Sequence, residues 1–166
     1  MGNFETENNN IAKLSYELTY HNYIMNRDNA RLLFKELSVS EYLLLHYLIK
    51  FTSESDAPKE KVYLMDLAEN LKQPMREISK LAGSLKDRGL IIWAHDGNGS
   101  EGTYLIITES GLKLVYRQDE IMKDYYGRVI QKYGKENVIA LLKMMSDLEE
   151  VIDSVFAEKG EEVYGN

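Results

Sequence analysis

A short stretch in the middle of the chain carries side chains that could hydrogen-bond to the edges of nucleic-acid bases. Gln73 has the paired amide donor and acceptor that match adenine, and Arg76 has the forked guanidinium that binds the two acceptors of guanine. Met75 could pack on the methyl group of thymine, and Ser79 and Lys80 offer donors one turn further along. The types and spacing of these residues indicate a base-reading surface.

Two further pairs of residues could contact the phosphate backbone. Lys86 and Arg88 follow on the same predicted helix and offer positive charge to phosphate. Asn98 and Ser100 lie in the glycine-rich segment 96–102 and could donate to phosphate from a protruding hairpin. Two plainer interpretations stay open. The helix residues could form an ordinary solvated face, and the segment could be only a turn, because its acidic residues repel phosphate.

Two short amphipathic helices joined by a tight turn must position the base-reading residues. Apolar residues recur at intervals of three and four over 64–71 and again over 78–85, which predicts the two helices. Gln73-Pro74 separates them, and proline suits the first position of the second helix because its missing N–H would be unpaired there. Gly89 is placed to end that helix. The pattern predicts a helix-turn-helix.

A β-hairpin and two capping signals complete the predicted module. β-rich runs over 90–95 and 103–108 flank the glycine-rich segment, which predicts a wing. Thr108 could cap the helix that follows the wing. Upstream, Ser38 and Glu41 form a capping box, which predicts that the apolar stretch after them is a helix at the centre of the domain.

Longer helices flank this module on both sides. Apolar residues over 11–32 mark one side of a long N-terminal helix, and helices over 112–133 and 138–156 follow the wing, with Gly134 between them. One small module cannot cover this much apolar surface, so we expect the outer helices to pack against a second subunit. The sequence therefore predicts a mainly α fold with a small β-hairpin wing. Its expected parts are an N-terminal dimerisation helix (1–37), a winged helix-turn-helix (38–110) and C-terminal dimerisation helices (111–166).

Charge and composition limit the possible functions. Of the 20 basic and 27 acidic residues, six of each lie between Lys61 and Thr108, so this segment is neutral and the net charge of −7 arises outside it. A neutral central module with acidic flanks fits a DNA reader, and it also fits an ordinary acidic protein. The chain has no cysteine, which excludes disulfides and thiol chemistry. Its three histidines lie far apart with no metal-site or hydrolase spacing, so we expect no metal, no cofactor and no enzymatic activity.

The start of the chain is polar, and no apolar run approaches the roughly 20 residues that a membrane span requires. We therefore expect no membrane association and a cytoplasmic location.

The order of these elements resembles the MarR family of transcription regulators (multiple-antibiotic-resistance regulators). The resemblance spans residues 11–158, nearly the whole chain, and rests on four segments that match in order and spacing. They are Leu37-Ser38-Val39-Ser40-Glu41-Tyr42, Leu67-Ala68-Glu69-Asn70-Leu71, Ile78-Ser79-Lys80 with Leu85-Lys86-Asp87-Arg88-Gly89-Leu90-Ile91, and Ile107-Thr108-Glu109-Ser110-Gly111. The chain departs from the family pattern in its wing, which has no arginine, and at Lys80, where the family often has arginine.

The resemblance implies a homodimeric regulator, most simply a repressor, that binds double-stranded DNA at a pseudo-palindromic operator. It also implies a small aromatic effector, for which the candidate residues are Tyr20, His21, Tyr42, His46 and Tyr47. A simpler interpretation of these five residues is core packing. Two other functions stay open: a winged helix that binds a protein instead of DNA, and a DNA binder without an effector.

Overall fold

The computed structural model describes residues 11–21, 32–53, 61–97 and 102–164. The chain divides into two compact units, Met1–Asp119 and Glu120–Asn166, and α5 (Glu109–Tyr133) runs through both. The sequence places boundaries after residues 37 and 110 instead. Its assignment of dimerisation to the outer parts stays a prediction.

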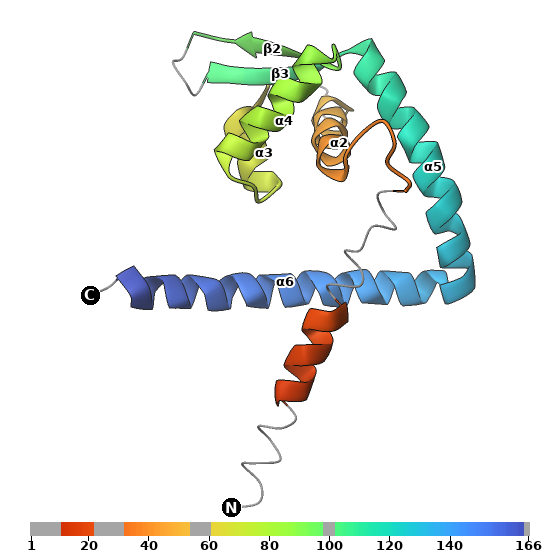
Figure 1. Ribbon diagram of the computed structural model, residues 1–166, viewed down its shortest axis with the longest axis vertical. Coiled ribbons are helices and arrows are strands. Elements are labelled where there is room, and N and C mark those ends of the chain that lie inside the picture. Colours follow the sequence, from red (N-terminus) through yellow and green to blue (C-terminus); the bar gives the residue numbers. More distant parts are fainter. Residues whose placement is uncertain (1–10, 22–31, 54–60, 98–101, 165–166) are drawn as a thin grey trace, which may run out of the picture. The chain divides into compact units, whose positions relative to one another are not determined.

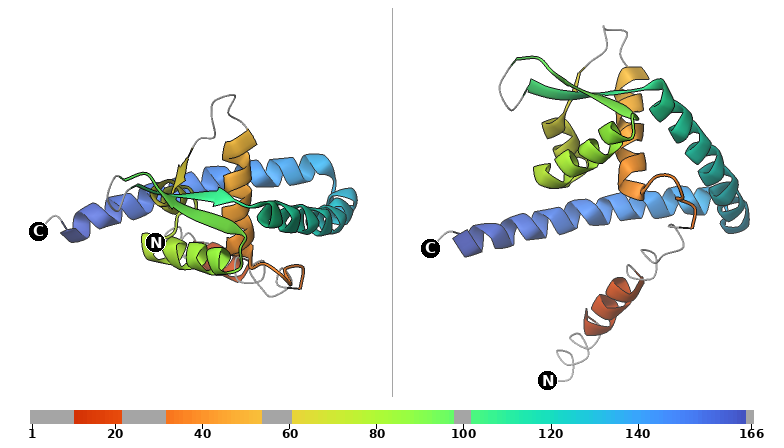
Figure 2. Two further views of the ribbon diagram at one scale, coloured as in Figure 1. Left: turned by 90° about the horizontal axis from the view of Figure 1, so that it is seen from above. Right: turned by 45° about the horizontal axis from the view of Figure 1, so that its top comes forward.

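The first unit contains a winged helix-turn-helix. Its elements are α2 (Val39–Ser53), β1 (Val62–Tyr63), α3 (Leu64–Asn70), α4 (Met75–Asp87), β2 (Ile91–His95), β3 (Thr103–Ile107) and the start of α5 (Figure 1). The three strands form an antiparallel sheet in the order β1-β3-β2. In both views of Figure 2, α3 and α4 lie next to each other beside the β2–β3 hairpin, in agreement with the contacts of α4 with α3 and β2. The predicted fold class is confirmed.

One hydrophobic core holds this unit together. Leu44, Leu45 and Leu48 of α2 lie at its centre and are fully buried. Ile78 and Leu85 give α4 its buried side, one from each half of the helix. Burying a side chain of this size contributes about 1.5–3 kcal/mol. The core therefore fixes which side of α4 faces inward, and hence which side faces out.

The predicted capping signals are present in the structure. The Ser38 hydroxyl accepts the N–H of Glu41 at 3.2 Å, and the Glu41 carboxylate accepts the N–H of Ser38 at 2.8 Å. Thr108 accepts the N–H of Gly111 at 3.1 Å and so caps α5. Gly134 has a φ of +98° between α5 and α6 (Lys135–Tyr164). These signals act over three residues or fewer, which is why the sequence reveals them.

The sequence predicts no element over Val62–Tyr63, but these two residues form β1, which pairs with β3 about 40 residues later. Two predictions are corrected. Pro74 is the N-cap of α4 and not its first helical residue. The helix predicted over 11–32 does not extend that far, because Leu32 lies in a turn, whereas residues 11–21 are helical.

The second unit has no comparable core. Within its described side chains, none from residue 120 to residue 158 is buried. Its large apolar side chains are exposed instead: on α6 these include Leu141, Met145, Leu148, Ile152 and Val155. In the part of the chain that the structure describes, no helix is long and apolar enough to span a membrane.

Candidate nucleic-acid interface

A backbone motif at the end of α3 creates the turn before α4. Lys72 takes a φ of +49°, and Gln73 donates its N–H to the carbonyl oxygen of Ala68 at 3.0 Å. This pattern is a Schellman motif, which normally has glycine at the left-handed position. Pro74 follows and begins α4, since its extended ψ of 141° cannot continue the previous helix. The turn thus brings Gln73 to the start of α4.

The first two turns of α4 present the predicted base-reading residues to solvent. Met75, Arg76 and Lys80 are exposed, as is Gln73 just before the helix, and Ser79 is half-buried. Ile78 is fully buried on the opposite side. The structure therefore brings these five residues together on one outward surface, which we call the α4 surface (Gln73, Met75, Arg76, Ser79 and Lys80). Whether DNA binds there stays a prediction.

The cations of α4 are available to a ligand. Among the described residues, Arg76, Lys80 and Lys86 have no carboxylate within ion-pair distance, unlike Arg117 or Arg128 on α5. An exposed cation that makes no internal bond can meet a phosphate or a base edge without breaking a contact within the protein.

Arg88, predicted to contact phosphate, is engaged inside the protein. Its Nη1 lies 3.0 Å from Oε1 of Glu41, and its Nη2 donates to the carbonyl oxygen of Glu36. Gly89, with a φ of +69°, ends α4 in a second Schellman motif, in which Leu90 donates its N–H to Leu85 at 2.9 Å. The structure thus gives Arg88 an internal role, whereas Lys86 is exposed.

The base of the wing is held by the side chain of Asp96. Tyr63 donates its hydroxyl to Asp96 at 2.8 Å, and Nζ of Lys61 lies 3.7 Å from the same carboxylate oxygen. Lys61 also lies over the ring of Tyr104, 4.8 Å from its centre. Asp96 is therefore neutralised locally and repels phosphate less than the sequence alone indicates. Asn98 and Ser100, the predicted wing contacts, lie outside the described residues.

The proposed effector residues fall into separate groups. Tyr42 and His46 contact each other, with ring centres 5.4 Å apart, whereas Tyr47 packs on Phe51. Tyr20 and His21 contact each other on the helix of residues 11–21. The structure thus brings two pairs together but separates Tyr47 from Tyr42 and His46.

Asp119 of α5 joins the first pair, and no sequence signal points to it. Tyr42 donates its hydroxyl to Asp119 at 2.7 Å, and Nε2 of His46 lies 3.8 Å from the same carboxylate oxygen. Burial of the phenol, its hydrogen bond to Asp119 and the charge of that carboxylate raise the pKa of Tyr42 to about 12. Within the described residues, no group of three or more acidic or histidine side chains could hold a metal ion.

Comparisons with solved structures identify the fold. A MarR family regulator from Neisseria meningitidis matches with a TM-score of 0.64 at 20% identity, covering 89% of this chain and 98% of its own. The PcaV transcriptional regulator from Streptomyces coelicolor, solved with its natural ligand, matches with a TM-score of 0.63 at 14% identity over 82% and 89%. MepR, a transcription regulator of the Staphylococcus aureus multidrug efflux pump MepA, matches with a TM-score of 0.55 at 19% identity over 85% and 97%.

These similarities confirm the resemblance to the MarR family at the level of the fold. The neighbours are transcription regulators that share nearly their whole length with this chain. No protein-family profile and no curated protein matches the sequence.

Proposed function

We propose that this chain is a sequence-specific DNA-binding transcription regulator that acts as a homodimer. The observation that carries the proposal is the α4 surface: polar and basic side chains on the first two turns of the second helix of a helix-turn-helix. The N-terminal residues of this helix contact base edges in proteins that read DNA with the motif. The fold neighbours support the same function, because they are transcription regulators.

Each residue of the α4 surface has a proposed role that follows from its chemistry. Arg76 binds guanine through its two terminal nitrogens, and Gln73 pairs with adenine. Met75 packs on a thymine methyl group, and Ser79 and Lys80 donate to bases or to phosphates beside them.

Beyond the α4 surface, Lys86 contacts phosphate from the later part of the helix. Arg88 is not among the proposed DNA contacts, because the Glu41 carboxylate and the carbonyl oxygen of Glu36 already bind its guanidinium.

The proposed dimer is supported by the exposed apolar face of the second unit. Val138, Leu141, Met145, Leu148, Ile152 and Val155 follow one another along α6 at alternating intervals of three and four. This spacing keeps apolar side chains on one side of a helix and suits packing against another helix. A face of this size on a separate chain is unfavourable in water, so a second copy is proposed to cover it.

A two-fold dimer implies a symmetric binding site. Two copies of α4 related by a two-fold axis read half-sites with their centres about 10 bp apart. Selection from a random duplex library with the purified protein, followed by footprinting, tests this. We expect a pseudo-palindrome with that spacing, and a single unrepeated half-site would contradict the dimer.

A regulator of this type works in the cytoplasm, and repression by blocking polymerase is the simplest mode.

The effector is a second part of the proposal and rests on the contacts among Tyr42, His46 and Asp119. Two rings and a carboxylate on neighbouring helices could bind an aromatic molecule with polar groups. The PcaV structure, which contains a natural ligand, shows that a protein of this fold binds one. Thermal-shift screening of aromatic acids tests this. A ligand that raises the melting temperature of the wild type but not of the His46→Ala variant supports the site.

The competing function, a winged helix that binds a protein, predicts no affinity for duplex DNA at any salt concentration. The α4 surface favours DNA, since its cations are exposed and unpaired within the described residues.

A further inference from the structure

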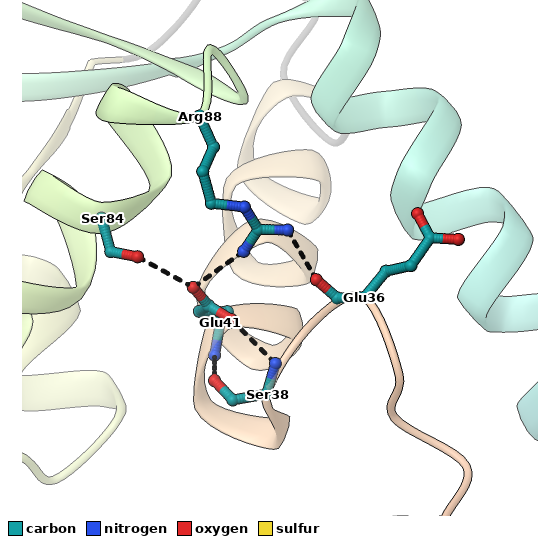
Figure 3. Close-up of polar contacts among 5 residues, drawn as sticks. All are labelled: Glu36, Ser38, Glu41, Ser84 and Arg88. Carbon is teal, nitrogen blue, oxygen red and sulfur yellow. Dashed lines mark hydrogen bonds and ion pairs between the residues drawn. The ribbon is translucent and has the colours of Figure 1, made fainter.

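A cluster of polar side chains joins the start of α2 to the end of α4 (Figure 3). Oε1 of Glu41 accepts hydrogen bonds from Ser84 at 3.2 Å and from Arg88 at 3.0 Å, while Oε2 accepts the N–H of Ser38. Glu41 is 8% exposed and is one of two buried polar residues among those described. The carboxylate is therefore fully used inside the protein.

The capping box alone does not require this carboxylate. A glutamine would accept the N–H of Ser38 equally well, because capping boxes use either residue at this position. Burying a charge costs free energy, and an apolar contact in the same place is often as stabilising as a buried ion pair. Burial by itself raises the pKa of Glu41, but the bonds from Ser38 and the charge of Arg88 outweigh it and lower the pKa. The charge on Glu41 therefore serves the contacts with α4.

These contacts hold α4 at one end only. Ser84 lies in the last turn of the helix and Arg88 is its C-cap, whereas Arg76 lies in the first turn. Twelve residues separate Arg76 from Arg88, which corresponds to about 18 Å along a helix. A rotation of about 10° around the anchored end therefore moves the first turn by about 3 Å. That distance is about the length of a hydrogen bond to a base.

The segment before α2 is itself held on its other side by α5. The Glu36 carboxylate accepts a bond from Arg117 at 3.0 Å, and Gln118 donates to the carbonyl oxygen of Leu33 at 3.1 Å. Arg88 donates to the carbonyl oxygen of Glu36, so α4 is tied to a segment that α5 also holds. The anchor of α4 is thus connected to two neighbouring elements.

We propose that Glu41 is a positioning residue for DNA reading: through Arg88 and Ser84 it fixes the direction of α4 and so the location of the α4 surface. This inference rests on the proposed function, because it assigns a role to α4 in binding bases. Glu41 itself contacts no DNA.

The first test compares specific with non-specific binding of the Glu41→Gln variant. The probes are a duplex selected by the wild-type protein from a random library and a scrambled duplex of equal length. We expect Glu41→Gln to lose about tenfold or more in affinity for the selected duplex and to keep its affinity for the scrambled one. The matched control is Glu109→Gln, which removes one charge and one exposed ion pair, with Lys113, and should change neither affinity.

The possible failures are distinguishable. If the wild type selects no duplex, the proposed function is wrong. If Glu41→Gln binds the selected duplex as tightly as the wild type, the positioning role is wrong although the function stands. If Glu41→Gln does not fold, Ser84→Ala removes only one of the bonds and is expected to give a smaller loss in the same direction. No loss in a folded Ser84→Ala variant would then overturn the proposal.

The second test measures the position of α4 without DNA. Because the chain has no cysteine, spin labels can be attached at Leu43→Cys on α2 and Glu77→Cys on α4, both exposed, with no background. Mixing the labelled protein with an excess of unlabelled protein leaves most dimers with one labelled subunit, so the measured distance is the one between the two labels of that subunit. We expect a narrow distance distribution in the otherwise wild-type protein and a broader or shifted one with Glu41→Gln, while Glu109→Gln leaves it unchanged. An unchanged distribution with Glu41→Gln would show that this residue does not position α4.

Discussion

Replacing Arg76 with alanine should remove base recognition while leaving the folded protein intact. Arg76 is exposed in the first turn of α4 and has no ion-pair partner among the described residues. The substitution therefore breaks no internal contact, and alanine is the residue most favourable to a helix. We expect the free energy of unfolding to change by less than about 0.5 kcal/mol, as for other surface substitutions.

The effect on binding follows from the contact that Arg76 is proposed to make. A bidentate bond from arginine to guanine contributes about 1–3 kcal/mol of discrimination against the wrong base. A dimer makes the contact twice, so the loss is about 2–6 kcal/mol, or at least about 30-fold in affinity. Arg76→Lys keeps the charge but not the fork, so it should bind scrambled duplex normally and discriminate poorly at that base pair.

Fluorescence anisotropy with the selected duplex measures the loss, and near-ultraviolet circular dichroism checks the fold. Lys113→Ala, which removes an exposed cation of α5 in the same unit, is the control and should bind normally. If Arg76→Ala binds the selected duplex as tightly as the wild type does, Arg76 does not read bases and the outward orientation of α4 has been misinterpreted.

Three further predictions concern stability and assembly. Gly111→Ala should destabilise the folded protein by about 1–3 kcal/mol, because the new Cβ would overlap the carbonyl oxygen of Leu90. Gly83→Ala should stabilise it, because the new Cβ meets no neighbour and alanine favours a helix. Thermal melts of the two variants test both predictions. Folding lowers the pKa of Glu41, so the ionised carboxylate stabilises the folded protein. This stabilisation is fully present when the pH is above the pKa of Glu41 in the unfolded chain, and it is lost as the pH falls through its pKa in the folded protein. In urea titrations, the free energy of unfolding of Glu41→Gln should therefore fall less at acid pH than that of the wild type. An equal fall in both proteins would contradict this. Light scattering should show a wild-type dimer with twice the chain mass of 19.2 kDa, and Ile152→Glu should convert it to a monomer. Lys143→Glu, on the opposite side of α6, should leave the dimer intact. If both variants are dimers, the apolar face of α6 is not the dimer interface.

Local signals in the sequence predict most of the fold. The capping box of Ser38 and Glu41, the cap at Thr108 and the glycine after α4 all act within a few residues, and all three are present in the structure. The outward orientation of the α4 surface also follows from local information, because the spacing of the buried residue Ile78 and its neighbours fixes the orientation of the helix.

Contacts between distant residues could not be predicted in this way. The strand β1 has only two residues, too few for a periodic pattern, and it exists because β3 pairs with it. Glu41 and Arg88 lie 47 residues apart, so the sequence does not show that they pair. Arg88 therefore looks like a phosphate contact in the sequence, although in the structure it binds the Glu41 carboxylate. Asp119 likewise meets Tyr42 only in the fold, 77 residues away.

The most direct test of DNA binding is the salt dependence of affinity for random duplex DNA, measured by anisotropy over a range of salt concentrations. If Arg76, Lys80 and Lys86 each meet a phosphate in both subunits, log affinity should fall against log salt with a slope of about −5. Lys86→Ala should reduce the slope by about one for each subunit. A protein that binds no duplex DNA even at the lowest salt concentration would contradict the proposed function and favour a protein partner.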